Sequence, residues 1–199
     1  MLFKEKLISI RIPVLYGIMD VFYGTMQVPI IGIGEVPIET IRRLEGMLNT
    51  EFSKIKIYAK GNVAFPEDTF NDFRDQYVAD RLMDEFHKDG IQILLTEEDI
   101  YSKGKNYVFG ESEYMGPALV STHRLDPQFY GEEKDEGLLF RRLKKEALHE
   151  FGHCFGMDHC ENPECVMQYS GSVKAVDEKS SMFCDECQVE ISTKGLPLK

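Results

Sequence analysis

Short apolar runs along the chain predict strands that alternate with helices. Residues 30–33, 54–58 and 91–95 are short apolar or alternating segments, and in residues 54–58 lysines alternate with apolar residues, as in a strand with one polar face. After Val36-Pro37 the apolar residues recur at steps of three and four, which predicts a helix. Its apolar face comprises Ile38, Ile41, Leu44, Leu48 and Phe52.

A second helix is predicted between the strands at residues 54–58 and 91–95. Pro66 and the residues Glu67, Asp68 and Thr69 after it are typical of a helix start, and the helix is expected to end before Gly90. The order of strand, helix, strand, helix, strand predicts a largely parallel sheet with right-handed crossovers. The apolar residues assigned to this second helix are Phe73, Tyr77, Val78, Leu82 and Phe86.

Two further strands are predicted at residues 106–110 and 117–121, paired as an antiparallel hairpin across Tyr114-Met115-Gly116. Such a strand at a sheet edge can hold an extended peptide. Residues 130–137 resemble a loop, and from Leu138 an amphipathic helix is expected to run into His149. The predicted fold is α/β: a compact single domain whose twisted, mixed but mostly parallel sheet packs with about three to four helices.

The N-terminal segment, residues 1–28, is expected to be an extension or an additional strand or helix, with residues 7–12 alternating loosely as in a strand. Its apolar stretch at residues 12–24 contains Asp20 and is shorter than the roughly 18–20 residues that a membrane span requires. No small-x-small cleavage site follows it, so an export signal is not expected. The domain itself is predicted to occupy residues 29–199, as one unit.

The net charge of the chain is −11 at pH 7. Nucleic-acid binding depends on clustered Lys and Arg, so this charge argues against DNA or RNA as a partner. We expect a monomeric, cytoplasmic protein that binds neither nucleic acid nor membranes.

The most informative segment is HEFGHCFGMDHC at residues 149–160. His149 and His153 lie four residues apart, so on a helix both rings reach the same side. Gly156 follows where the chain must leave the helix and turn back, which requires a residue that tolerates positive φ. That turn allows His159 to complete a three-histidine zinc site with an open fourth position for water.

Glu150, next to the first histidine, is placed to act on water and not to bind the metal. Zinc lowers the pKa of bound water from 15.7 to roughly 7, and Glu150 would accept the proton during attack and pass it to the leaving amine. The expected reaction is peptide-bond hydrolysis, with a peptide or an unfolded protein segment as substrate. The alternative is a zinc-stabilised interaction module with little or no turnover.

All five cysteines lie in the last third of the chain, and four of them form two pairs. Cys160 and Cys165 are followed by the C-x-x-C pair Cys184 and Cys187, which is typical of a four-cysteine structural zinc site. Two zinc ions per chain are therefore expected, one catalytic and one structural. A disulfide pair or a redox C-x-x-C are the competing interpretations. The fifth residue, Cys154, is expected to face the core.

The histidine string with a methionine downstream resembles the metzincin metalloproteases. Together with Cys160 directly after the last histidine and the trailing C-x-x-C, it looks like the archaemetzincin family. Upstream similarities include Arg74-x-Gln76-Tyr77, Thr96-x-x-Asp99, Val108-Phe109-Gly110 and Ser121-Thr122-x-Arg124-Leu125.

The resemblance implies a metzincin-like protease domain with a catalytic zinc at the three histidines and a structural zinc in the C-terminal region. It makes Met167 the methionine of the turn beneath the zinc ligands. Tyr169 has the spacing of a tyrosine that in some metzincins steadies the reaction oxyanion, so it is a candidate transition-state stabiliser; a packed aromatic residue is the alternative.

Overall fold

The computed structural model describes residues 25–196 and 198–199, so the strand predicted at residues 7–12 and the apolar stretch at residues 12–24 lie outside the described residues. The strands are β1 (Met26–Ile33), β2 (Ile55–Val63), β3 (Phe70–Asn71), β4 (Gln76–Val78), β5 (Gln92–Thr96), β6 (Ile100–Tyr101), β7 (Gly110–Ser112) and β8 (Pro117–Ser121). The α-helices are α1 (Ile38–Leu48), α2 (Ala79–Asp84), α3 (Glu136–Cys154), α4 (Val173–Glu178) and α5 (Asp185–Thr193), with short 3₁₀ helices at His87–Asp89 and Pro127–Tyr130.

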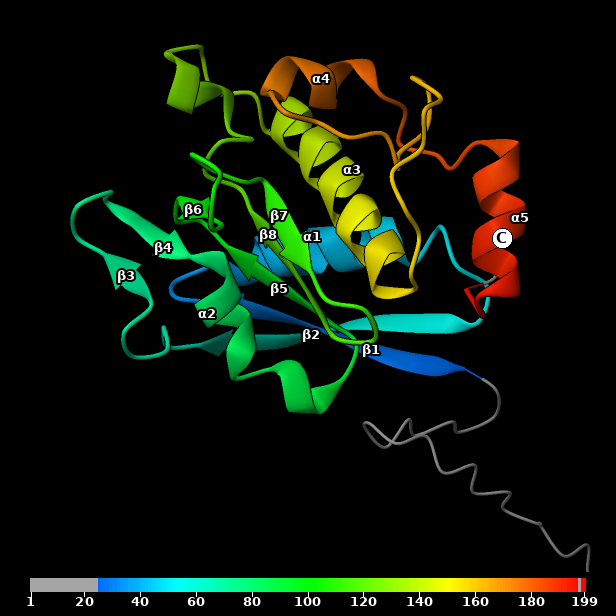
Figure 1. Cartoon of the computed structure of the whole chain (residues 1–199), viewed down its shortest axis with the longest axis horizontal. Coiled ribbons are helices and arrows are strands. Elements are labelled where there is room, and N and C mark those ends of the chain that lie inside the picture. Colours follow the sequence, from blue (N-terminus) through cyan, green and yellow to red (C-terminus); the bar gives the residue numbers. More distant parts are fainter. Residues whose placement is uncertain (1–24, 197) are drawn as a thin grey trace, which may run out of the picture.

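Five strands form the main sheet, in the order β2-β1-β5-β8-β7 (Figure 1). The first four are parallel, and β7 pairs antiparallel with β8 at the edge. This arrangement confirms the predicted mixed but mostly parallel sheet and the antiparallel pairing at its end. β7 is therefore one of the two edge strands of this sheet, and β2 is the other.

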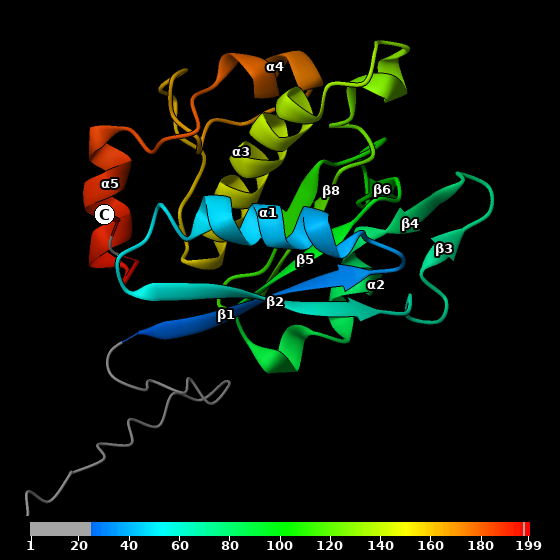
Figure 2. The same cartoon turned by 180° about the vertical axis from the view of Figure 1, so that it is seen from behind.

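Helices cover both faces of this sheet. α1 and α3 pack on one face and α2 on the other, as the two opposite views show (Figures 1 and 2). Successive strand residues point to opposite faces: in β1, Ile30 belongs to the apolar cluster under α1 and α3, whereas Ile31 belongs to the cluster under α2. Packing in the larger cluster holds α3 over β8 and β7, which sets the position of its histidines.

The helix predicted from Pro66 to Phe86 is wrong in its first part. Residues 69–78 form the hairpin of β3 and β4, and α2 begins only at Ala79. Asp68 and Asp75 take positive φ angles that a helix excludes, and Phe73, one of the apolar residues assigned to that helix, is fully exposed at the hairpin tip. Tyr77 stacks on Phe65, which precedes the hairpin, so this aromatic residue is packed without a helix.

Smaller differences concern element ends. The strand expected at residues 106–110 starts only at Gly110, and α1 ends at Leu48, so Phe52 lies beyond it in a bridge to Leu198. β1 starts at Met26, a little before the expected start of the domain at residue 29. The described residues contain five α-helices, of which α4 and α5 were not predicted as helices.

Three of the four upstream similarities contribute to one polar network beside the small β3-β4-β6 sheet. Asp99 accepts two hydrogen bonds of 2.7 Å from Arg124 and one of 2.9 Å from Gln76, which in turn accepts from Arg74. Bidentate pairing of this kind fixes orientation as well as distance. The network therefore ties the hairpin to the segment that follows β8.

Candidate active site

The histidine-bearing helix α3 has defined ends. Asp135 caps its start by accepting a hydrogen bond of 2.9 Å from the Leu138 amide. At its far end Gly156 has φ +74°, and the Met157 amide bonds back to the Gly152 carbonyl. The turn expected at Gly156 is thus confirmed, and it redirects the chain toward His159.

His149 and His153 are oriented by backbone carbonyls. Nδ1 of His149 lies 2.9 Å from the Val166 carbonyl oxygen, and Nδ1 of His153 lies 2.6 Å from that of Met157. A carbonyl only accepts, so each Nδ1 carries the proton and each Nε2 presents a lone pair. The two Nε2 atoms are 3.2 Å apart, and two lone pairs at this distance need a cation between them.

His159 completes the group. The ligand atoms of the three histidines all lie within 4.8 Å of one another, and the His159 ring lies 4.8 Å from that of His153. Burial lowers the pKa of His149 to about 2, with the Lys179 ammonium adding to the effect, and burial also lowers the pKa of His153 and His159. The neutral imidazole, the form that binds zinc, is favoured at all three. The residues present fit a zinc ion.

Glu150 lies outside this ligand group but in the same cleft. Its Oε2 accepts a hydrogen bond of 2.7 Å from the Ser112 hydroxyl on β7. Burial raises the pKa of Glu150 to about 8, while the Ser112 hydrogen bond acts in the opposite direction. A carboxyl group with this pKa is suited to exchange protons near neutral pH.

Met167 is fully buried and lies against the histidine-bearing helix α3. Its sulfur packs against the α3 backbone at Gly152, and its carbonyl accepts a hydrogen bond of 2.9 Å from the Cys160 amide. The segment after His159 is therefore joined to the turn that carries Met167.

A buried ion pair lies beside the same turn. Lys179, with no exposed side-chain surface, places Nζ 2.9 Å from Oε1 of Glu146 and 3.3 Å from the Gln168 carbonyl oxygen. Lys179 follows α4, and Glu146 lies one helical turn before His149. The pair thus connects α3 to the residue directly after Met167.

The second cluster contains the four predicted cysteines. The Sγ atoms of Cys160, Cys165, Cys184 and Cys187 lie within 4.8 Å of one another, with 3.8 Å between those of Cys160 and Cys184. A disulfide requires about 2.05 Å, and all five cysteines of the described residues are free. Amide groups point at two of the sulfurs, since Asn162 donates to Cys160 and Cys184 to Cys165. This geometry fits a tetrahedral thiolate site. Cys154, as expected, lies in the core.

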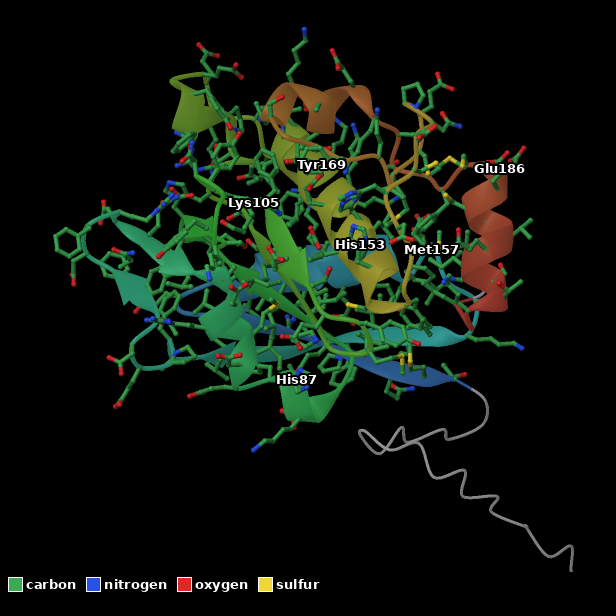
Figure 3. The ribbon with its side chains drawn as sticks, in the orientation of Figure 1. His87, Lys105, His153, Met157, Tyr169 and Glu186 are labelled. Atoms are coloured by element: carbon green, nitrogen blue, oxygen red, sulfur yellow. The ribbon has the colours of Figure 1, made fainter. Side chains whose placement is uncertain are left out.

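A cleft of about 630 Å³ exposes the histidines. Figure 3 shows Lys105, His153 and Tyr169 reaching this region from three separate segments of the chain. Tyr169 is 56% exposed, with its ring 5.2 Å from that of His159. It is therefore next to the site and not packed in the core.

Sequence reasoning missed three residues of this region: Ser112, Glu146 and Lys179. Glu146 stands three residues before His149, on the same helix face, so a signal for it was present. Ser112 and Lys179 reach the site through contacts between segments far apart in the chain, which no local pattern announces.

Comparisons with known proteins point to one family. Residues 27–193 match the profile of "Peptidase family M54". An archaemetzincin of Pyrococcus furiosus is 38% identical over 169 residues, covering 79% of this chain and 88% of that protein. One of Nanoarchaeum equitans is 42% identical over 143 residues, covering 70% and 76%.

Solved structures give the same result. The archaemetzincin of Methanopyrus kandleri superimposes with a TM-score of 0.75 at 30% identity, covering 86% of this chain and 96% of that one. A zinc-dependent peptidase of Methanocorpusculum labreanum gives a TM-score of 0.75 at 28% identity, covering 82% and 99%.

Proposed function

The chain belongs to peptidase family M54, the archaemetzincins, and is a zinc metallopeptidase; on that premise we propose that His149, His153 and His159 hold the catalytic zinc and that Glu150 is the general base. The observation that carries this assignment is the facing pair of Nε2 atoms, 3.2 Å apart, with both Nδ1 atoms engaged by carbonyls. A buried carboxylate in the same cleft supplies the proton acceptor.

In this proposal the histidines, Glu150 and Tyr169 have separate roles. Zinc, when bound, supplies a Lewis acid that polarises the substrate carbonyl and lowers the pKa of water. The three neutral imidazoles hold the ion. Glu150 takes a proton from the attacking water and delivers it to the departing amine, acting first as base and then as acid. Tyr169, exposed beside His159, is placed to donate a hydrogen bond to the developing oxyanion.

The substrate is proposed to be a peptide or an unfolded segment that pairs with β7. β7 is the last strand of the main sheet, and its residues Gly110 and Ser112 line the cleft. Main-chain hydrogen bonds to an edge strand hold any extended sequence, with side-chain pockets supplying preference.

A second, structural zinc is proposed at the four cysteines. Cys160 adjoins His159, and its amide is bonded to the Met167 carbonyl, so an ion at the cysteines would fix the segment that carries the third histidine. Four thiolates leave no position for substrate, so this ion has no part in hydrolysis.

The test is Glu150→Gln against a peptide library, with zinc content measured in parallel. We expect cleavage to fall at least about 1,000-fold while zinc content stays unchanged, because the variant keeps all three imidazoles but cannot accept a proton. Cleavage at the wild-type rate by the variant would refute the role of Glu150. Wild-type protein that holds zinc but cleaves nothing would favour the interaction module.

The chain is further proposed to act as a monomer in the cytoplasm, as expected from its sequence, without nucleic-acid partners. Among the residues that the structure describes, no helix has the length and apolar character to cross a membrane.

A further inference from the structure

Two residues of β7 face the carboxylate of Glu150. Gly110 and Ser112 are two positions apart in the strand, so they point to the same face, the one that contacts α3. The Ser112 hydroxyl donates to Oε2 of Glu150 at 2.7 Å. Among the described residues, no side chain or amide donates to Oε1. One oxygen of the carboxylate is therefore held and the other is left for water.

Gly110 provides the space for this arrangement. A Cβ added there would lie 2.5 Å from Cγ of Glu150 and 2.8 Å from its Oε1. The same atom would also lie 2.7 Å from the Leu119 carbonyl oxygen, which belongs to the paired strand and has little freedom to move. Any side chain at position 110 must displace Glu150 or break the pairing of β7.

We propose that Gly110 and Ser112 form a seat that positions Glu150 for proton transfer. This inference rests on the proposed function, since it assigns positioning residues to the proposed base. It adds that β7 has two roles: it pairs with the substrate and it orients Glu150. A peptide paired with β7 is then aligned with the carboxylate by a shared element. Neither residue touches the reacting atoms in this scheme; both act through Glu150.

The test uses the zinc-loaded full chain with Ser112→Ala, Ser112→Thr and Gly110→Ala, each assayed for kcat, KM and zinc content. Losing a hydrogen bond to a charged group lowers rates by roughly 10- to 100-fold. We expect Ser112→Ala to lose this factor in kcat with KM within about twofold, and Ser112→Thr, which keeps the hydroxyl, to recover most of it. Gly110→Ala should lose at least as much.

Ser121→Ala is the matched control. Ser121 is a buried serine in the neighbouring strand β8, and its hydroxyl donates to the Glu98 carbonyl at 2.6 Å, away from Glu150. We expect a similar small drop in Tm for the two alanine variants but a changed kcat only for Ser112→Ala. A merely structural role for Ser112 predicts equal kcat values for the two folded proteins.

A crystal structure of Ser112→Ala gives a readout that does not depend on activity. The proposal predicts that the Glu150 carboxylate leaves its position in the wild-type protein or spreads over several rotamers. An unmoved carboxylate together with an unchanged kcat would overturn the seat while leaving the proposed function intact. If Glu150→Gln keeps full activity, the proposed function fails, and the carboxylate position still decides whether the seat exists.

Discussion

The sulfur of Met167 lies in the space that a side chain on Gly152 would occupy: a Cβ at Gly152 would stand 2.5 Å from that sulfur. Gly152 is one residue before His153 on α3, so the methionine is in contact with the helix at the level of the proposed zinc ligands. Met167 can pack against α3 at this point only because this helix position carries no side chain.

Gly152→Ala should therefore destabilise the protein and weaken zinc binding at the histidines. In an unobstructed helix, replacing glycine by alanine adds about 1 kcal/mol of stability. Gly46 in α1 has nothing within 4 Å of the added Cβ and is the matched control. We expect Gly46→Ala to raise the Tm and Gly152→Ala to lower it, measured by thermal unfolding of the metal-free and zinc-loaded proteins. A stabilised Gly152→Ala would contradict this packing.

The buried pair of Glu146 and Lys179 predicts strong energetic coupling. Removing one partner leaves an uncompensated buried charge, at a cost of about 3–5 kcal/mol. We expect Glu146→Gln and Lys179→Met each to lower the free energy of unfolding by about this amount, and the double variant to cost much less than their sum. Chemical denaturation of all four proteins measures the coupling. Additive effects would show that the two side chains do not interact.

The same pair predicts a pH dependence. Burial raises the pKa of Glu146 above its ordinary 4.5, and Lys179 opposes this effect. In Lys179→Met the opposition is lost, so the pKa of Glu146 rises further. A carboxyl whose pKa is higher in the folded state loses stability as pH rises from the unfolded-state pKa through the folded-state pKa.

The destabilisation caused by Lys179→Met should therefore be largest at neutral pH and shrink as pH falls toward 4.5. Denaturation at several pH values checks this difference. In the background of Glu146→Gln, Lys179→Met should show no such trend, because the titrating carboxyl is absent. A gap that widens on acidification has the wrong sign for this mechanism.

Cys184→Ser tests the two-site arrangement by metal content. We expect the zinc count to fall from two per chain to one, and the region after His159 to become sensitive to limited proteolysis. Structural zinc binding contributes on the order of 10–16 kcal/mol, comparable with the stability of a domain. Cys154→Ala, which alters the cysteine outside the cluster, should keep both ions. An unchanged count in Cys184→Ser would refute the second site.

Tyr169→Phe tests the oxyanion role. Removing one oxyanion donor lowers kcat on the order of 100-fold or more, and we expect a loss of this size with little change in zinc content. Tyr114→Phe is the control, because the Tyr114 ring, and not its hydroxyl, lies over Gly156. If both variants keep the wild-type kcat, Tyr169 has no catalytic part.

The parts of the site that the sequence predicted are those set by local geometry. A four-residue spacing on a helix brings His149 and His153 together whatever surrounds them, and the positive φ of Gly156 follows from the need to turn toward His159. The cysteine cluster was predictable from its paired spacing. The alternating and apolar segments likewise predicted the main sheet.

What could not be predicted depends on contacts between distant segments. The hairpin at residues 69–78 has aromatic residues at helical spacing, and only the turn conformations of Asp68 and Asp75 separate the two interpretations. Ser112 becomes relevant because β7 lies over α3, and Lys179 because its segment folds back onto Glu146. No hydrophobic periodicity in the sequence predicts these contacts between distant segments.

The reversed orientation of β7 gives the cleft a polarity. β7 runs opposite to the four parallel strands of the sheet, so a peptide in antiparallel register with it travels in the same sense as β8. A peptide turned end for end would pair with β7 in the parallel pattern, whose hydrogen bonds are slanted and evenly spaced. The direction of this one three-residue strand would then decide which end of the cleft receives the N-terminal side of a substrate and which end receives the C-terminal side.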